Sequence, residues 1–147
     1  MTSLKKNIAS LAGDAEFGVG ADQVRLAAAE TKLGIIIPSG LRDFLKEADG
    51  VRADHGAGVI WPIARIVSEN LAFRSDSDFR ELYMPFDDLL FFADDGGGDQ
   101  FAFAIHADGR IHKNDIFRWE HESDGRVWFA AGLSDYAARR LSESYYK

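Results

Sequence analysis

Residues 90–101 read Leu-Phe-Phe-Ala-Asp-Asp-Gly-Gly-Gly-Asp-Gln-Phe, so two strongly apolar runs enclose three aspartates and three glycines. The apolar runs predict two strands of the protein core, because they are short, rich in aromatic residues and bounded by turn residues. The glycines predict a tight connection, since glycine adopts positive φ without steric cost. The stretch therefore holds Asp94, Asp95 and Asp99 between two core strands, which suggests a binding edge.

The rest of the chain reads as helices first, then strands, then a closing helix. Helical spacing of apolar residues covers 4–11, 22–33, 39–48 and 63–71, and Ser134 is a candidate cap for the last helix. Strands are expected at 59–61, 89–93, 101–106, 116–122 and 126–129, with Asp108-Gly109 turning the chain into a short strand at 110–112. Between 74 and 88 the pattern weakens into an acidic loop.

Acidic residues are concentrated between 76 and 99, where they face Arg80 alone and account for the whole net charge of −7. They are Asp76, Asp78, Glu81, Asp87, Asp88, Asp94, Asp95 and Asp99. An acidic chain repels phosphate groups, so binding to nucleic acid or to an anionic membrane is not expected. A basic protein is the natural partner for such a surface.

The chain contains no cysteine, which fits a reducing compartment and excludes thiolate chemistry. Its N-terminus lacks the apolar core of a signal peptide, and no apolar stretch approaches the ~18 residues of a membrane span. We therefore expect a cytoplasmic protein of 147 residues that folds as a single domain, 1–147.

Large apolar residues fall into two groups. Those on successive strand candidates are expected in the core: Phe91, Phe92, Phe101, Phe103, Ile105, Trp128 and Phe129. Others are candidate anchors for a partner, because tight binding usually needs a few buried aromatic or arginine side chains: Trp61, Phe79, Tyr83 and Trp119. Phe79, Tyr83 and Phe86 lie near the acidic residues, where they either pin that loop to the body or stay exposed as anchors.

The loop from Asp94 to Asp99 has three interpretations. The simplest is a tight connection between strands with solvated aspartates. The second is a protein-binding edge, and the third is a calcium or magnesium site, because hard cations prefer oxygen ligands. The loop lacks the spacing of an EF-hand, and its glycines lead into a Phe-Ala-Phe strand rather than a phosphate-binding helix. No metal and no cofactor is predicted.

Residues 119–122 read Trp-Glu-His-Glu and fit a strand with Trp119 and His121 on one face and Glu120 and Glu122 on the other. Paired carboxylates also occur in acid–base catalysis, but that requires separations and raised pKa values that a sequence does not show. The four histidines match no metal-binding spacing. We therefore predict no catalytic residue and a protein that is not an enzyme.

Several short landmarks follow one another along the chain: Leu33-Gly34, Ile37-Pro38, Phe44-Leu45, Asp49-Gly50, Ile63 to Asn70, Ala93 to Phe101, and Trp119 to Glu122. Together they resemble the SUKH superfamily, which contains many bacterial immunity proteins and the fungal cell-wall assembly regulators of the Smi/Knr type. The resemblance runs from about Leu26 to Leu141 and leaves an N-terminal helix, 1–20, outside. Asp49 departs from the family pattern, which often has asparagine there, as does the helix start at Leu133 to Tyr136.

The resemblance implies an α+β fold in which an antiparallel multi-stranded β-sheet packs against helices. It also implies an immunity protein that neutralises a cognate toxin, often a nuclease, by direct protein binding. Two alternatives stay open: a regulatory scaffold of the cell-wall assembly type, and a metal-dependent enzyme. The residues expected to bind the partner are Glu81, Asp87, Asp88, Asp94, Asp95, Asp99, Glu120, Glu122, Tyr83 and Trp61.

Overall fold

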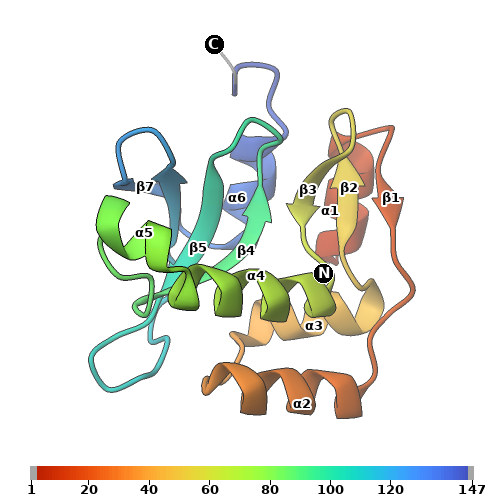
Figure 1. Ribbon diagram of the computed structural model, residues 1–147. Coiled ribbons are helices and arrows are strands. Elements are labelled where there is room, and N and C mark those ends of the chain that lie inside the picture. The colour runs from red at the N-terminus through yellow and green to blue at the C-terminus, as the bar shows by residue number, and fades with distance from the viewer. Residues whose placement is uncertain (1–2, 146–147) are drawn as a thin grey trace.

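Two antiparallel sheets lie side by side in the computed structural model, which describes residues 3–145 (Figure 1). The three-stranded sheet has the order β1-β2-β3, with β1 (Glu16–Phe17), β2 (Val51–Ala53) and β3 (Ala57–Ile60). The four-stranded sheet has the order β4-β5-β6-β7, with β4 (Leu89–Asp94), β5 (Gln100–Ala104), β6 (Ile116–Glu120) and β7 (Gly125–Ala130). The helices are α1 (Leu4–Leu11), α2 (Gln23–Leu33), α3 (Ser39–Glu47), α4 (Ile63–Ser75), α5 (Ser77–Leu82) and α6 (Leu133–Arg140). The predicted α+β fold, with antiparallel strands packed against helices, is confirmed.

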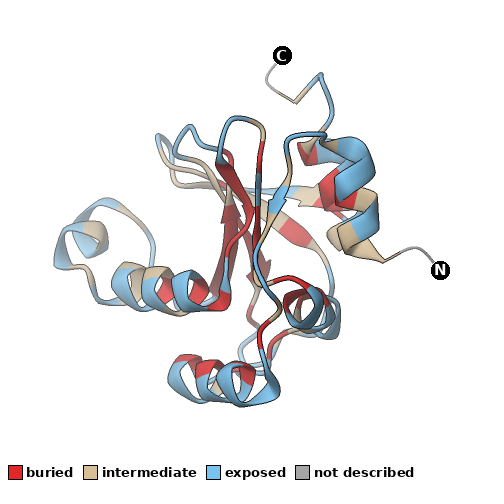
Figure 2. Cartoon of the chain, turned by 90° about the vertical axis from the view of Figure 1, so that its right-hand side faces the viewer, coloured by how far each residue is buried: buried red, intermediate tan, exposed pale blue. Residues whose placement is uncertain are grey.

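The strands form the middle layer of the molecule. Figure 2 shows them mostly buried, between α4 and α5 on one side and the N-terminal helix α1 on the other. The predicted core residues Phe91, Phe92, Phe101 and Phe103 are buried there. The prediction that Trp128 belongs to the core is wrong: it is 48% exposed, because β7 is an edge strand. No helix within residues 3–145 is long and apolar enough to cross a membrane.

Local sequence signals explain where α2 begins and ends. The Asp22 carboxylate accepts a 2.8 Å hydrogen bond from the Arg25 N–H, and Gly34 ends the helix at a φ of 69°, both as predicted. The same reasoning is wrong for α6. The residue at the cap position of α6 is Gly132. Ser134 lies inside the helix and cannot cap it, because the backbone of Ser134 is already helical.

Two predictions about loops and short strands are also wrong. The segment expected as an acidic loop contains α5, and the Asp76 carboxylate caps this helix by accepting the Asp78 and Phe79 N–H groups. A helix this short leaves no apolar period in the sequence. Residues 110–112 form no strand although Gly109 makes the expected turn at a φ of 81°, because the β5–β6 ladder ends before this loop.

The N-terminal region, expected as a helix over 1–20, contains the shorter helix α1 followed by β1. Residues 1–2 lie outside the described residues. Ile8 of α1 is fully buried, and Glu16 of β1 pairs with Arg52 of β2. This region therefore packs onto the domain as an additional helix and an edge strand.

The outer edge of β4 receives its hydrogen bonds from outside its own sheet. Asn70, buried in α4, donates from Nδ2 to the Phe91 carbonyl and accepts the Phe91 N–H at Oδ1, both at 2.8 Å. The Trp61 N–H, just after β3, donates to the Phe92 carbonyl at 2.8 Å. These contacts join α4 and the three-stranded sheet to β4, so they close the junction between the two sheets.

The Asn70→Ala variant should lower the free energy of unfolding by about 2–4 kcal/mol, because it leaves the buried N–H and C=O groups of Phe91 without partners. Chemical denaturation measures the change. Ser68→Ala, at an exposed position of the same helix, is the control and should stay within about 0.5 kcal/mol of the wild type. Equal stability of the two variants would show that the Asn70 amide is not needed at this junction.

Candidate functional site

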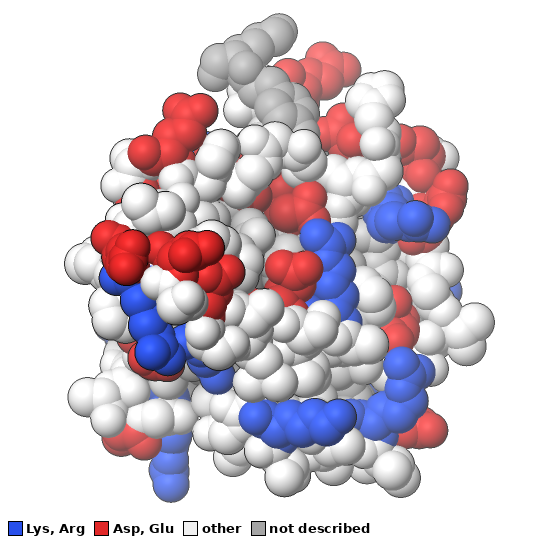
Figure 3. All heavy atoms as spheres, viewed as in Figure 1, with Lys and Arg blue, Asp and Glu red and all other residues white. Residues whose placement is uncertain are grey.

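Five exposed carboxylates form what we call the acidic rim: Asp78 and Glu81 on α5, Asp87 and Asp88 in the loop before β4, and Glu122 in the β6–β7 turn. The Glu122 side chain is 88% exposed. Figure 3 shows acidic atoms mainly over the upper part of one face, with some basic atoms among them, and further basic atoms along its lower part, near α2. The rim residues predicted to bind a partner are thus accessible to one.

The β4–β5 loop is a tight turn built on glycine. Gly96 and Gly98 have φ values of 79° and 109°, a region that other residues rarely adopt. The Asp94 and Asp95 carboxylates each accept a 2.8 Å hydrogen bond from a loop N–H, that of Gly96 and Gly97 respectively. This geometry agrees with the simplest of the three interpretations, a compact connection between strands.

Asp94 lies at the junction between the two sheets. Its carboxylate accepts a 2.6 Å hydrogen bond from the Trp61 indole N–H and lies 3.3 Å from the Arg65 guanidinium. A Cβ on Gly58 would come within 2.6 Å of the same carboxylate, so this close approach requires glycine. Trp61 is fully buried, and the prediction that it binds a partner is wrong, because its indole bridges to the end of β4.

Asp95 is buried beneath the turn that follows α6. The Tyr145 hydroxyl donates to its carboxylate at 3.0 Å. Burial raises the pKa of Tyr145, so this hydroxyl keeps its proton and remains a donor. Asp95 therefore supports the loop and, contrary to the prediction, does not present a surface charge to a partner.

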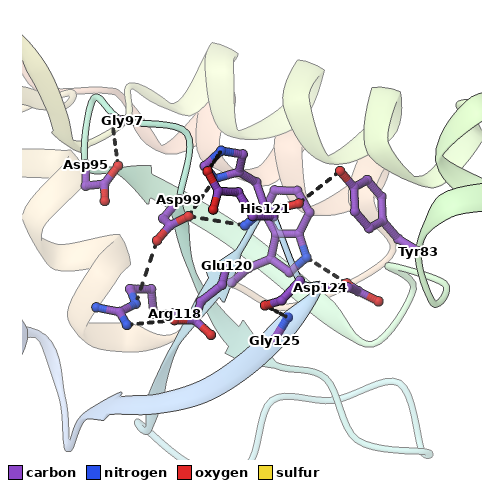
Figure 4. A network of polar contacts seen from close by, with 12 residues as sticks. Tyr83, Asp95, Gly97, Asp99, Arg118, Glu120, His121, Asp124 and Gly125 are labelled. Carbon is purple, nitrogen blue, oxygen red and sulfur yellow. Dashed lines mark hydrogen bonds and ion pairs between the residues drawn. The ribbon is translucent and has the colours of Figure 1, made fainter.

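Asp99 fastens the loop to the β6–β7 turn (Figure 4). Its carboxylate accepts the His121 backbone N–H at 3.1 Å and lies 2.7 Å from the His121 Nδ1. The carboxylate raises the pKa of His121, because it stabilises the charged imidazolium. Arg118 lies 3.9 Å from Asp99 and 2.9 Å from Glu120, so the negative charges of both residues are partly compensated.

Glu120 and Glu122 are not arranged as a catalytic pair. Glu120 is the last residue of β6 and bonds to Arg118, whereas Glu122 lies in the turn and points to solvent. The prediction that Trp119 and His121 share one face of a strand is also wrong, because the strand ends before His121. No group of His, Asp and Glu side chains able to hold a metal ion occurs in the described part of the chain.

Aromatic rings hold α5 and the following loop against the sheet. The Tyr83 and Phe86 rings lie 5.2 and 5.4 Å from the Trp119 ring, and Phe79 lies 5.5 Å from Tyr83. The Tyr83 hydroxyl also donates to the His121 carbonyl at 3.1 Å. The sequence left open whether Phe79, Tyr83 and Phe86 pin the acidic segment to the body or stay exposed as anchors. The structure shows the first arrangement. Trp119 is buried among them, so its prediction as a partner anchor is wrong.

Two residues that the sequence analysis did not single out, Asp124 and Arg126, complete this arrangement. Asp124 accepts the Trp119 indole N–H at 2.7 Å and the Met84 N–H at 2.8 Å. Arg126 donates to the Met84 and Pro85 carbonyls at 2.9 and 3.0 Å. Strands were expected on either side of this turn, at 116–122 and 126–129, but the turn sequence carries no signal for side-chain contacts with so distant a segment.

The acidic rim and the β4–β5 loop both lie within a region that matches a known family. The family model SUKH_6, described as SMI1-KNR4 cell-wall, matches residues 23–136, which is more than half of the chain. The match extends from the start of α2 into α6. No curated protein matches the chain.

Gly98→Ala should lower the free energy of unfolding by about 1–3 kcal/mol, because alanine is strained at this φ and its Cβ would lie 2.7 Å from the His121 ring. Gly97→Ala is the matched control. Its Cβ would meet nothing closer than 3.5 Å, and we expect a change within about 0.5 kcal/mol. If denaturant unfolding gave the same loss for both, the loop would not depend on positive φ at Gly98.

The pKa of His121 should exceed its ordinary value of 6.5 and fall in Asp99→Asn, because the variant removes the charge that stabilises the imidazolium. Glu122→Gln, 4.0 Å from Nε2, should lower this pKa less. Titration of the ring signals by NMR measures both. Since the folded pKa is raised, the pair stabilises the protein fully below pH 6.5 and loses this effect as the pH rises through the folded pKa. A wild-type pKa at or below 6.5 would contradict this.

Proposed function

Since the chain belongs to the SUKH_6 (SMI1-KNR4 cell-wall) family, we propose that it is an immunity protein of a bacterial toxin system. In this proposal the protein acts in the cytoplasm, binds a cognate toxin directly and carries out no reaction of its own. The observation that carries the proposal is the acidic rim, a set of exposed carboxylates on a segment held in place by contacts beneath it. The toxin that fits this surface best is a nuclease.

The charge of the rim supports a nuclease as the partner. A nuclease binds phosphate groups, so its active site is basic, and a surface of opposite charge can occupy or shield it. Electrostatic attraction of this kind raises association rates by roughly 10 to 10³ fold. Because the rim carboxylates are exposed, salt screens them and should weaken the complex.

Apolar side chains beside the rim can supply the contact area that charge alone does not. Leu82 and Met84, in the same segment as Glu81 and Asp87, are 70% and 59% exposed. An apolar centre bordered by polar groups is the usual anatomy of a protein interface. Tyr83 lies between them and is half-buried, so it remains among the proposed contacts.

The rim is also held in a fixed arrangement before any partner arrives. Asp124 and Arg126 bind the backbone of Met84 and Pro85, and Tyr83 is bonded to the turn that carries Glu122. A surface that is already ordered loses less conformational entropy on binding. This pre-organisation favours a specific complex over transient attraction to any basic protein.

The proposal is tested by capturing proteins from the native cells on the immobilised chain, identifying them by mass spectrometry and purifying the main one. Its affinity is then measured, at low and moderate salt, for two variants that lose the same charge. The rim variant is Glu81→Gln with Glu122→Gln, and the control is Asp43→Asn with Glu47→Gln at exposed positions of α3. We expect a basic partner whose affinity falls about tenfold with the rim variant at low salt and less than about twofold with the control.

Co-expression separates toxin neutralisation from a scaffold role. The captured protein should stop growth when produced alone and should be harmless when produced with the wild-type chain, while the rim variant should protect less. A partner that is not toxic would contradict the immunity role and favour a regulatory scaffold. Equal loss of affinity in the two variants would show that the acidic rim is not the contact surface.

A further inference from the structure

Strand β7 has a free outer edge. It pairs only with β6, and no hydrogen bond within residues 3–145 joins the backbone of residues 126–130 to any other segment. In an antiparallel ladder every second residue directs its N–H and C=O away from the paired strand. From Gly125 to Trp128 the register with β6 is regular, so this stretch offers an ordered row of unpaired backbone groups.

The side chains of β7 do not protect this edge. Val127 and Trp128, which point to opposite faces of the sheet, are each 48% exposed. Proteins usually guard such edges with lysine, proline or another exposed charge, and β7 has none. Its one charged residue, Arg126, has a side chain that is only 13% exposed, because it is bound to the Met84 and Pro85 carbonyls and to Asp88.

We propose that β7 pairs antiparallel with β7 of a second copy of this chain, so that two four-stranded sheets become one continuous sheet. An antiparallel strand is self-complementary about a two-fold axis perpendicular to the sheet, which makes a closed dimer. The two-fold axis passes beside the exposed residues Val127 and Trp128. One of these two residues therefore faces the same residue of the second copy. The β7 edge adjoins the acidic rim, since Arg126 of β7 pairs with the rim carboxylate of Asp88 at 3.0 Å, but the inference does not depend on the toxin role.

The charges around β7 favour a second copy over a basic partner. The Trp128 indole N–H donates to Asp115 at 3.1 Å, and the Arg139 guanidinium lies over the same ring at 5.4 Å. Arg139 is itself paired with Asp135 at 2.9 Å. At the start of β7, Arg126 is likewise paired with Asp88 at 3.0 Å. The arginines beside the edge are therefore each compensated by a carboxylate, so two copies can approach without strong repulsion between these charges.

Light scattering after gel filtration, and sedimentation over a wide concentration range, test the dimer. The wild type should shift from a mass of 16.3 kDa to twice that value as concentration rises. Val127→Lys should raise the dissociation constant at least about tenfold, because it places two like charges near the two-fold axis. Val24→Lys, at a position on α2 that is 77% exposed, is the matched control and should leave the constant within about twofold.

The absence of cysteine allows a second, independent test. Single cysteines are introduced by Val127→Cys, Trp128→Cys and, as a control, Val24→Cys. Residues that face each other across antiparallel strands lie within disulfide reach, so mild oxidation should cross-link one of the two β7 variants much faster than the control.

Three outcomes would overturn the proposal. They are a wild type that stays monomeric at every concentration, a dimer that Val127→Lys leaves intact, and cross-linking at neither β7 position above the Val24→Cys control. A monomer whose Val127→Lys variant loses a captured protein would assign the edge to a strand of that partner and also overturn self-pairing.

Discussion

The hydrogen bonding of one amide side chain to the outer edge of β4 is the contact on which the other parts of the structure depend. The Asn70 amide offers one donor and one acceptor to Phe91, as a residue of a neighbouring strand would. Because the edge is satisfied in this way, α4 can lie where a strand would otherwise be required. The Trp61 N–H satisfies the next carbonyl and brings the three-stranded sheet alongside. Two sheets are thereby joined without a continuous ladder, and β4 stays buried with its backbone groups paired.

The acidic residues serve two different purposes, and the junction of the sheets explains the division. Asp94, Asp95 and Asp99 accept hydrogen bonds from Trp61, Tyr145 and His121, so they hold the β4–β5 loop to three separate parts of the chain. The carboxylates of the acidic rim are instead exposed, although that of Asp88 also accepts a 3.0 Å hydrogen bond from Arg126. The net charge of −7 belongs to the whole chain. The rim carboxylates expose more negative charge than the loop aspartates do, because the loop aspartates accept hydrogen bonds within the domain.

Patterns that are local in the chain could be predicted from the sequence, and contacts between distant segments could not. The apolar runs around the glycines predict β4 and β5, and Asp22 with Gly34 predicts the ends of α2, because these signals act within one or two turns of the chain. β1, β2 and α5 are too short to show a period. Whether Trp128 is buried depends on which strand lies at the edge of the sheet, and whether Asp94 is free depends on Trp61, which lies 33 positions away. Those facts follow from topology, which the sequence pattern alone does not determine.

The separation of supporting from exposed carboxylates has an evolutionary consequence. The side chains of Glu81, Asp87 and Glu122 make no hydrogen bond within residues 3–145, so replacing these side chains leaves the hydrogen bonding of the domain unchanged. Such positions can drift or be selected rapidly, whereas a change at Asp94 or Asn70 disturbs the junction of the sheets. In the proposed role, the pattern of exposed charge can therefore change from one lineage to another while the architecture of the domain stays the same.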